Sequence, residues 1–324
     1  MAGEEQQERT RRVAIQIGWL GWTLLTLALL AGVGALALRH ALQTNAVAVL
    51  DGTDRLLRGG EGDIRLVASA NFGTDPHQRL EMFLPANAKG PLPVVVFIHG
   101  GSWATGRPDD YRFVARALAP HGYAVVLPGY RLFPEVRYPA MLEDGAAALR
   151  WVADNAAAHG GDPSRVVLMG HSAGAYNAMM LALDRRWLEH QRLSADFLRG
   201  VVGLSGPYDF YPWDDPASVD TFGKASDPED TQPIAHARGD APPLLLVHGT
   251  ADTRVKPRNS VALARAMTHD GAPTQVVLLK DVTHEGLIMM FARPFSRDAR
   301  ALDAVLPFLA KVTAPSPAVQ SAAR

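Results

Sequence analysis

The sequence predicts an α/β protein with a mostly parallel central sheet and helices on both faces of that sheet, preceded by one N-terminal transmembrane helix. Two observations predict the sheet: short continuous apolar runs recur along the chain, and segments with helical patterning alternate with them. Such runs are typical of parallel strands that are buried on both faces. A third observation predicts the membrane helix, because residues 13–38 hold no charged residue.

The first element is the apolar segment of residues 13–38. At about 1.5 Å per residue, a helix of this length exceeds the roughly 30 Å hydrocarbon core of a bilayer. Trp19 and Trp22 lie near its start, where aromatic side chains suit the membrane interface. Three arginines lie within residues 9–12, so the positive-inside rule places residues 1–12 in the cytoplasm. We therefore expect a single-pass membrane protein whose remaining chain faces outward, as in the periplasm of a bacterium.

A cleaved signal peptide is the alternative for the same segment, and it would make the protein secreted. Ala35, Leu36 and Ala37 form an A-x-A pattern of the kind that precedes a cleavage site. The apolar stretch is longer than the roughly 7–15 residues of a usual signal peptide. The sequence therefore favours an uncleaved anchor.

One α/β domain is expected over residues 60–312, after a linker at 39–59 and before a disordered tail at 313–324. The tail is rich in Ala, Pro and Ser. Strands are expected at residues 63–70, 80–84, 93–99, 123–127, 165–169, 200–204, 244–248 and 275–279. Helices are expected at residues 110–118, 139–159, 172–183, 260–270 and 297–311.

Composition narrows the class of protein. The chain has 324 residues, of which 48% are hydrophobic and 20% are charged, as in an ordinary globular protein. The formal net charge of −1 offers no basic surface that would neutralise phosphates, so nucleic acid is not an expected partner. The chain has no cysteine, which excludes disulfides, thiolate metal sites and cysteine nucleophiles.

A short polar motif, GHSAG at residues 170–174, separates the strand at 165–169 from the helix that follows. A serine between a buried strand and a helix has the placement of a nucleophile elbow, and glycines on both sides let the backbone turn sharply there. Ser172 is therefore the candidate nucleophile. A serine hydroxyl is a weak nucleophile at neutral pH, so this assignment requires a base and an acid that orients the base.

The base and the acid are expected later in the chain, in the order serine, acid, histidine. His284 follows the last expected strand and precedes another helix, so it is the candidate base. Asp252 follows the preceding strand and reaches the same edge of the sheet, which makes it the candidate acid. Asp281 is the rival for the acid, but it lies only three residues before His284 and is expected at the end of its own strand.

A second loop, HGGSW at residues 99–103, directly follows the strand at 93–99. Its glycines allow the backbone to approach a substrate carbonyl closely. The backbone N–H groups of Gly101 and Ser102, with that of Ala173 beside the candidate nucleophile, are expected to form an oxyanion hole. Trp103 is expected to line the substrate pocket, with core packing as the alternative role.

Together these motifs resemble the α/β-hydrolase superfamily and, within it, the carboxylesterase branch. The chain is similar to hormone-sensitive-lipase-like esterases, kynurenine formamidase-like enzymes and feruloyl-esterase-like enzymes over about residues 60–312, including segments 130–144 and 161–170. It departs from the lipase-like subgroup at Ser102, where that subgroup usually has a third glycine. The resemblance implies a serine hydrolase with a Ser172-His284-Asp252 triad, and no metal or organic cofactor is implied.

We expect a serine carboxylic-ester hydrolase that forms an acyl-enzyme on small or medium acyl esters. Residues 206–243 join two strands without strong periodicity and are expected to form a lid or binding loop that is too short for a large cap domain. An amidase or formamidase with the same triad is the alternative. A non-catalytic binding protein on this fold is a third interpretation, disfavoured because no member of the triad is missing.

Overall fold

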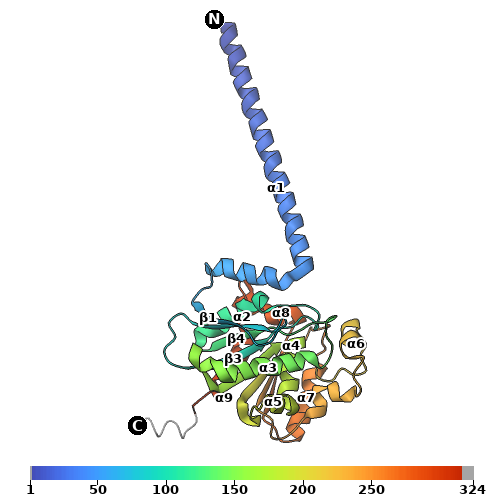
Figure 1. Ribbon diagram of the computed structural model, residues 1–324. Coiled ribbons are helices and arrows are strands. Elements are labelled where there is room, and N and C mark those ends of the chain that lie inside the picture. Colours follow the sequence, from blue (N-terminus) through green and yellow to red (C-terminus); the bar gives the residue numbers. More distant parts are fainter. Residues whose placement is uncertain (1, 316–324) are drawn as a thin grey trace. The chain divides into compact units, whose positions relative to one another are not determined.

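The computed structural model (Figure 1) describes residues 2–315, and the chain divides into two compact units, Met1–Val49 and Leu50–Arg324. The last residues of the expected tail, 316–324, lie outside the described residues. The second unit holds the sheet and all the candidate site residues, whereas the first consists of helix alone.

The long N-terminal helix α1 (Ala2–Arg58) is broken at Asn45, which has non-helical dihedral angles of φ −154° and ψ 81°. The Asn45 side chain accepts a hydrogen bond of 3.0 Å from the backbone N–H of Ala48 and so caps the helical segment that follows. The helical stretch Trp22–Arg58 contains one window that is long and apolar enough, by length and composition, to cross a membrane. Its exposed large apolar side chains before residue 39 are Trp22, Leu24, Leu27, Leu29, Leu30, Val33, Leu36 and Leu38.

The segment expected to be a linker, residues 39–59, is helical as far as Arg58, and its final turns belong to the second unit. These turns are joined to the domain by buried charge. The Arg116 guanidinium, whose side chain is only 1% exposed, lies 2.5 Å from the Asp51 carboxylate, 2.6 Å from Asp54 and 2.8 Å from Glu61. Asp51 also accepts a hydrogen bond of 2.7 Å from the backbone N–H of Phe113. We call Arg116, Asp51, Asp54 and Glu61 the Arg116 cluster.

Eight strands form one sheet in the order β1-β2-β4-β3-β5-β6-β7-β8. The pairs β1·β2 and β2·β4 are antiparallel and the other five pairs are parallel, so the predicted mostly parallel sheet is confirmed. Every strand lies at a position that the apolar runs predict. The strands are β1 (Ile64–Asn71), β2 (Arg79–Pro85), β3 (Leu92–Ile98), β4 (Ala124–Pro128), β5 (Gly161–His171), β6 (Leu198–Leu204), β7 (Leu244–Gly249) and β8 (Thr274–Leu279).

Helices cover both faces of the sheet, as two glycines of β6 illustrate. A side chain at Gly200 would contact Phe308 of α9, whereas one at Gly203 would contact Met179 of α4. Because the two glycines are three residues apart on one strand, they face opposite sides. The remaining helices are α2 (Arg112–Leu118), α3 (Ala140–Asn155), α4 (Ala173–Leu183), α5 (Arg186–His190), α6 (Pro216–Phe222), α7 (Arg258–His269), α8 (His284–Met289) and α9 (Arg300–Val312).

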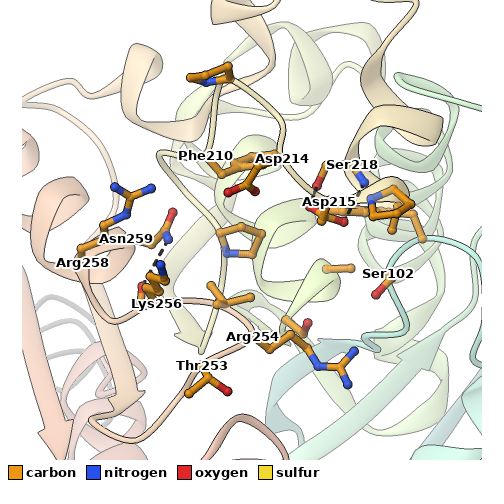
Figure 2. Close-up of a pocket in the computed structure, with 18 residues that line it drawn as sticks. Ser102, Phe210, Asp214, Asp215, Ser218, Thr253, Arg254, Lys256, Arg258 and Asn259 are labelled. Atoms are coloured by element: carbon orange, nitrogen blue, oxygen red, sulfur yellow. Dashed lines mark hydrogen bonds between the residues drawn. The ribbon is translucent and has the colours of Figure 1, made fainter.

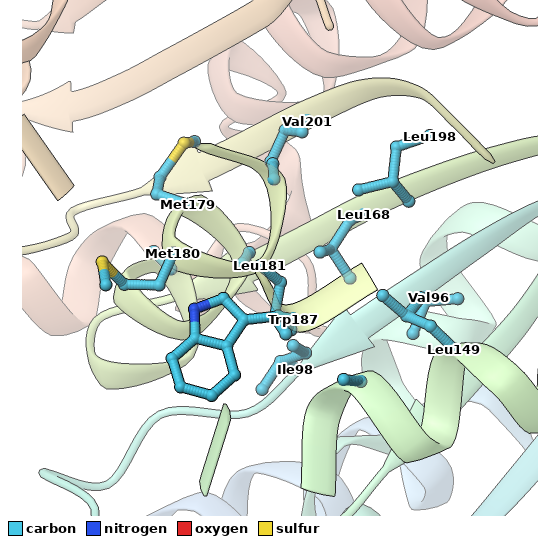
Figure 3. Close-up of a cluster of buried hydrophobic side chains, with 14 of the residues drawn as sticks. Val96, Ile98, Leu149, Leu168, Met179, Met180, Leu181, Trp187, Leu198 and Val201 are labelled. Atoms are coloured by element: carbon cyan, nitrogen blue, oxygen red, sulfur yellow. The ribbon is translucent and has the colours of Figure 1, made fainter. Parts of the chain in front are cut away.

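Helix α4 is the centre of the core, since all eleven of its residues are buried. A helix that is apolar on every side is expected inside a protein rather than on its surface. Figure 3 shows Leu181 of this helix grouped with Leu168 of β5 and Val201 of β6. This packing fixes the start of α4, and therefore Ser172, against the sheet.

The strand order brings two loops together at one edge of the sheet. After β3 the chain forms β4 on one side of β3, and it then crosses over to form β5 on the other side. The connections leaving the carboxyl ends of β3 and β5 therefore diverge and leave a crevice between them, which is where open α/β sheets bind ligands. The loop at residues 99–103 follows β3 and Ser172 follows β5, so both lie at this crevice.

Candidate active site

Ser172 occupies the sharp turn between β5 and α4. Its backbone has φ 55° and ψ −122°, a region that non-glycine residues rarely adopt and that costs about 1–3 kcal/mol. The flanking glycines make this turn possible, because a side chain at Gly170 would collide with the backbone of Gly174, and one at Gly174 would collide with the carbonyl of Ile98. The turn thus needs glycine on both sides of the serine.

Ser172, His284 and Asp252 come together at the carboxyl edge of the sheet, each of them less than 9% exposed. The Ser172 Oγ lies 2.8 Å from Nε2 of His284, and Nδ1 of His284 lies 2.7 Å from Oδ2 of Asp252. A carboxylate only accepts hydrogen bonds, so Nδ1 carries the proton and Nε2 is free to accept the serine proton. We call these three residues the Ser172 cluster.

The loops after β7 and β8 are tied to each other by short hydrogen bonds. The backbone N–H of Asp281 donates to the Thr250 hydroxyl at 2.9 Å. The Thr283 hydroxyl accepts from the backbone N–H of Gly286 at 3.1 Å and caps α8, whose first residue is His284. Asp281 itself is exposed in a turn with φ 60°, so the structure brings Asp252 and not Asp281 to the histidine.

The Asp252 carboxylate is surrounded by hydrogen-bond donors. Burial by itself would raise its pKa, but hydrogen bonds from His248 and His284 outweigh burial and hold the pKa well below its ordinary value. The other oxygen, Oδ1, accepts from the backbone N–H groups of Arg254 at 3.0 Å and Val255 at 2.9 Å. The group is therefore a fixed anion beside the histidine.

Two of the three candidate oxyanion donors line the pocket beside Ser172, and the third precedes one of them in the chain. Ser102 and Ala173 line the pocket that contains Ser172, and Gly101 precedes Ser102 with φ 117°. Within residues 2–315, the backbone N–H groups of Gly101, Ser102 and Ala173 donate no hydrogen bond to the protein. Ser102 adopts φ 53°, a left-handed conformation that glycine adopts more readily, which fits the glycine of the lipase-like pattern.

His99 stabilises the conformation of the loop at residues 99–103. Its Nδ1–H donates to the Gly100 carbonyl oxygen at 2.8 Å, and its ring stacks on Tyr130 with ring centroids 4.4 Å apart. Burial lowers the pKa of His99 to about 4, so the ring is neutral at physiological pH. Its place is structural rather than in contact with a reacting group.

Trp103 combines the two roles that the sequence left open. It lines the pocket, yet it is only 4% exposed and its indole N–H donates to the Asn177 side chain at 3.1 Å. Its ring meets Tyr176 and Phe222 edge to face, at centroid distances of 5.3 Å and 4.8 Å. Trp103 is therefore a rigid part of the pocket floor.

The pocket beside Ser172 has a volume of about 630 Å³ and is lined largely by the β7–α7 loop and by the 206–243 insertion. Figure 2 shows Lys256 and Arg258 on one side of it and Ser102 and Asp215 on the other. The insertion includes α6 and contributes several of the lining residues, as expected of a binding loop. The charged lining residues are Asp214, Asp215, Arg254, Lys256 and Arg258.

The sequence pattern assigned no role to two histidines near the site, His171 and His248. His171 donates from Nε2 to the backbone carbonyl of His284 at 3.2 Å, and burial together with the nearby His284 lowers the pKa of His171 to about 3. His248 lies at the end of β7, with Nε2 at 3.3 Å from Oδ2 of Asp252. The sequence signal that could have identified these two histidines is their position at the carboxyl ends of β5 and β7. Among residues 2–315, no group of three or more potential ligands is arranged for a metal ion.

Comparison with known proteins identifies the family of the chain. The family model BD-FAE matches residues 80–267, which is more than half of the chain. The chain belongs to the BD-FAE family. An isoprenylcysteine alpha-carbonyl methylesterase of Arabidopsis thaliana is 30% identical over 240 residues, covering 67% of this chain and 56% of that protein. The carboxylesterase NlhH of Mycobacterium tuberculosis is 47% identical over 108 residues, covering 33% of this chain and 34% of that protein.

Solved structures support the α/β-hydrolase fold. Esterase B of Lactobacillus rhamnosis superposes with a TM-score of 0.71 at 23% identity, over 88% of this chain and 95% of that one. A carbohydrate esterase from gut microbiota superposes with a TM-score of 0.65 at 20% identity, over 78% of this chain and 97% of that one. The chain spans about half the length of the curated relatives it matches. The chain has the α/β-hydrolase fold and is similar to proteins named as esterases.

Proposed function

We propose that the protein is a serine carboxylic-ester hydrolase that acts through Ser172, His284 and Asp252. The observation that carries this proposal is the continuous chain of hydrogen bonds from the Ser172 hydroxyl through the imidazole to the buried carboxylate, 2.8 Å and 2.7 Å long, at the wall of a pocket. Relatives named as esterases support the same chemistry.

In the first half-reaction, Ser172 Oγ attacks the ester carbonyl carbon while its proton passes to Nε2 of His284. The carbonyl oxygen becomes an oxyanion, and the N–H groups of Gly101, Ser102 and Ala173 are the donors proposed to stabilise it. In a serine protease, one such donor is worth about 3–4 kcal/mol. His284 then gives its proton to the departing alkoxide, which leaves as the alcohol and leaves an acyl-serine behind.

In the second half-reaction, water takes the place of the alcohol. As the water attacks the acyl carbon, His284 accepts a proton from this water. His284 returns that proton to Ser172 Oγ when the carboxylic acid is released. Asp252 stays ionised throughout and stabilises the imidazolium that forms twice in each cycle. Its lowered pKa is what this role requires.

The acyl group is proposed to be small or medium in size. The pocket volume of about 630 Å³ suits a compact ligand, and five charged side chains in its lining disfavour a long hydrocarbon chain. The name of the Arabidopsis relative, a methylesterase, supports a small leaving alcohol. A series of esters that differ only in acyl length tests this proposal, with activity expected to peak at short chains.

The decisive test of the mechanism is Ser172→Ala in the full-length protein. We expect kcat for ester hydrolysis to fall by about 10⁵-fold or more, as in serine proteases that lack their nucleophile, and labelling by a serine-reactive phosphonate to disappear. Ser205→Ala is the matched control, since Ser205 is buried at the end of the neighbouring strand β6. Labelling of the Ser172→Ala protein would remove Ser172 as nucleophile. Faster turnover of N-formyl amides than of esters would favour the formamidase alternative.

We also propose that residues 13–38 anchor the protein in a membrane, with residues 1–12 in the cytoplasm and the hydrolase domain, residues 60–312, outside. The apolar helical stretch within Trp22–Arg58 supports this. Full-length protein is expected in the membrane fraction, resistant to alkaline extraction, with the domain accessible to external protease. A soluble form that begins near Leu38 would instead identify a signal peptide.

A further inference from the structure

His248 is a fully buried histidine that lies four residues before Asp252, at the end of β7. Its Nδ1 lies 2.8 Å from the Ser260 hydroxyl oxygen. Its Nε2 lies 2.8 Å from the Val255 carbonyl oxygen and 3.3 Å from Oδ2 of Asp252. The ring therefore bridges the start of α7, the β7–α7 loop and the carboxylate of the Ser172 cluster.

The partners of His248 define where its proton lies. The Val255 carbonyl and the Asp252 carboxylate can only accept hydrogen bonds, so Nε2 must carry a hydrogen. The Ser260 hydroxyl is then free to donate to Nδ1, which satisfies both ring nitrogens with one neutral tautomer. The single Nε2–H lies against two oxygens, one of which, Oδ2 of Asp252, also accepts the hydrogen bond from Nδ1–H of His284.

We propose that His248 is a positioning residue for the reaction, a role that rests on the proposed function. Oδ1 of Asp252 is held by two backbone N–H groups, whereas the partners of Oδ2 among residues 2–315 are His284 and His248. By holding both Oδ2 and the Val255 carbonyl, His248 keeps Oδ2 aimed at His284. The contact matters most when His284 becomes an imidazolium, so its loss lowers kcat more than it raises KM.

Full-length protein in detergent provides the test, with His248→Leu, His248→Gln and a matched control. Losing one hydrogen bond to a charged group in the transition state lowers kcat by about 10- to 100-fold, and this is expected of His248→Leu, with KM changed by less than about twofold. The glutamine amide retains an N–H donor, so His248→Gln restores most of kcat. The control is His236→Leu, because His236 Nε2 lies 2.8 Å from the Asp230 carbonyl and 3.7 Å from its carboxylate, in an arrangement like that of His248 but away from the cluster.

A double-mutant cycle separates positioning from mere packing. If His248 acts through Asp252, adding His248→Leu to Asp252→Asn lowers kcat by less than about threefold further. An equal loss in both backgrounds, or wild-type kcat in His248→Leu, overturns the proposal. If His248→Leu does not fold, Ser260→Ala replaces it in the same cycle, since it removes the hydroxyl that orients the ring. If the wild type hydrolyses esters and the His248 variants retain its kcat, this inference alone is wrong. If the wild type is inactive on every ester, the proposed function is wrong and this inference fails with it.

Discussion

The Arg116 cluster and the Ser172 cluster each contain a buried aspartate, Asp51 and Asp252, yet the pKa values of these two groups move in opposite directions. Burial raises the pKa of Asp51, although Arg116 and the N–H of Phe113 act against it, and the nearby Glu61 adds to the rise. Burial acts the same way on Asp252, but there the hydrogen bonds win and the pKa falls. The pKa values of two buried aspartates are thus shifted in opposite directions.

The number of hydrogen-bond donors explains the difference. Asp51 accepts hydrogen bonds from one guanidinium and one backbone N–H, and the nearby Glu61 carboxylate adds negative charge. Asp252 accepts hydrogen bonds from two backbone N–H groups and from His284, and the Nε2–H of His248, shared with the Val255 carbonyl, lies beside the same carboxylate. Burial alone therefore does not make a carboxylate reactive or inert; the donors around it decide whether it stays ionised.

The two clusters also differ in what they face. Ser172 lines a pocket of about 630 Å³, whereas the Arg116 guanidinium bonds to groups of α1 and the residues just after it. An ion network whose charges pair with one another holds segments of the chain together. An ion pair with one end at a pocket can act on a ligand. Variants in each cluster should therefore separate activity from stability.

The largest expected effect is on activity, from Asp252→Asn. Asparagine keeps the shape of the side chain but presents an N–H or a weaker acceptor to His284, which leaves the wrong tautomer facing Ser172. By protease precedent kcat falls by about 10⁴-fold. Asp281→Asn is the control and should retain nearly all activity, because Asp281 is exposed in a turn. The reverse result, with both proteins folded by circular dichroism, would make Asp281 the acid.

The next largest effect is on stability, from Arg116→Met. Removing the guanidinium leaves Asp51 buried without its main partner and leaves Asp54 with Arg58 as its remaining ion pair, which should cost about 3–5 kcal/mol in the free energy of unfolding. The kcat of the protein that remains folded should be unchanged. Arg150→Met is the matched control: Arg150 pairs with Asp154 one helical turn away, and both are partly exposed. Denaturant unfolding should then show a change of less than about 1 kcal/mol, and equal losses in the two variants would contradict a structural role for the cluster.

The smallest effect is a dependence of stability on pH that arises beside the Ser172 cluster. Burial lowers the pKa of His171 to about 3 and that of His99 to about 4, below the ordinary value of 6.5. The unfolded chain takes up a proton at each histidine as pH falls below 6.5, while the folded protein does not until about pH 4 or 3, so stability is present above 6.5 and is lost as pH falls.

His171→Gln and His99→Gln should each make this loss shallower by about 1.4 kcal/mol per pH unit between about pH 6 and pH 4.5. Denaturant unfolding at several pH values measures the slope, which is independent of any overall change in stability that the substitution causes. A slope identical to that of the wild type would mean that these histidines titrate in the folded protein as they do in the unfolded chain.

Local pattern was sufficient to predict the sheet and the members of the Ser172 cluster. A strand buried on both faces must be apolar at successive positions, so runs such as residues 93–99 identify it directly. Parallel strands end at one common edge, so residues that follow separate strands can be assigned to one site before their distances are known. Ser172, Asp252 and His284 are such residues.

What the tertiary structure alone decided is the choice of partner for each buried polar group. Arg116 bonds to Asp51 and Asp54, which lie more than sixty residues earlier in the chain. Local periodicity therefore could not predict that part of the expected linker at residues 39–59 is a packed helix. His248 reads in the sequence as the last residue of a strand, and only the fold shows that its ring reaches the Asp252 carboxylate. Apolar patterning reports whether a position is buried, because burial is a property of one residue at a time. A hydrogen bond is a property of two, and its geometry exists only after both segments have packed.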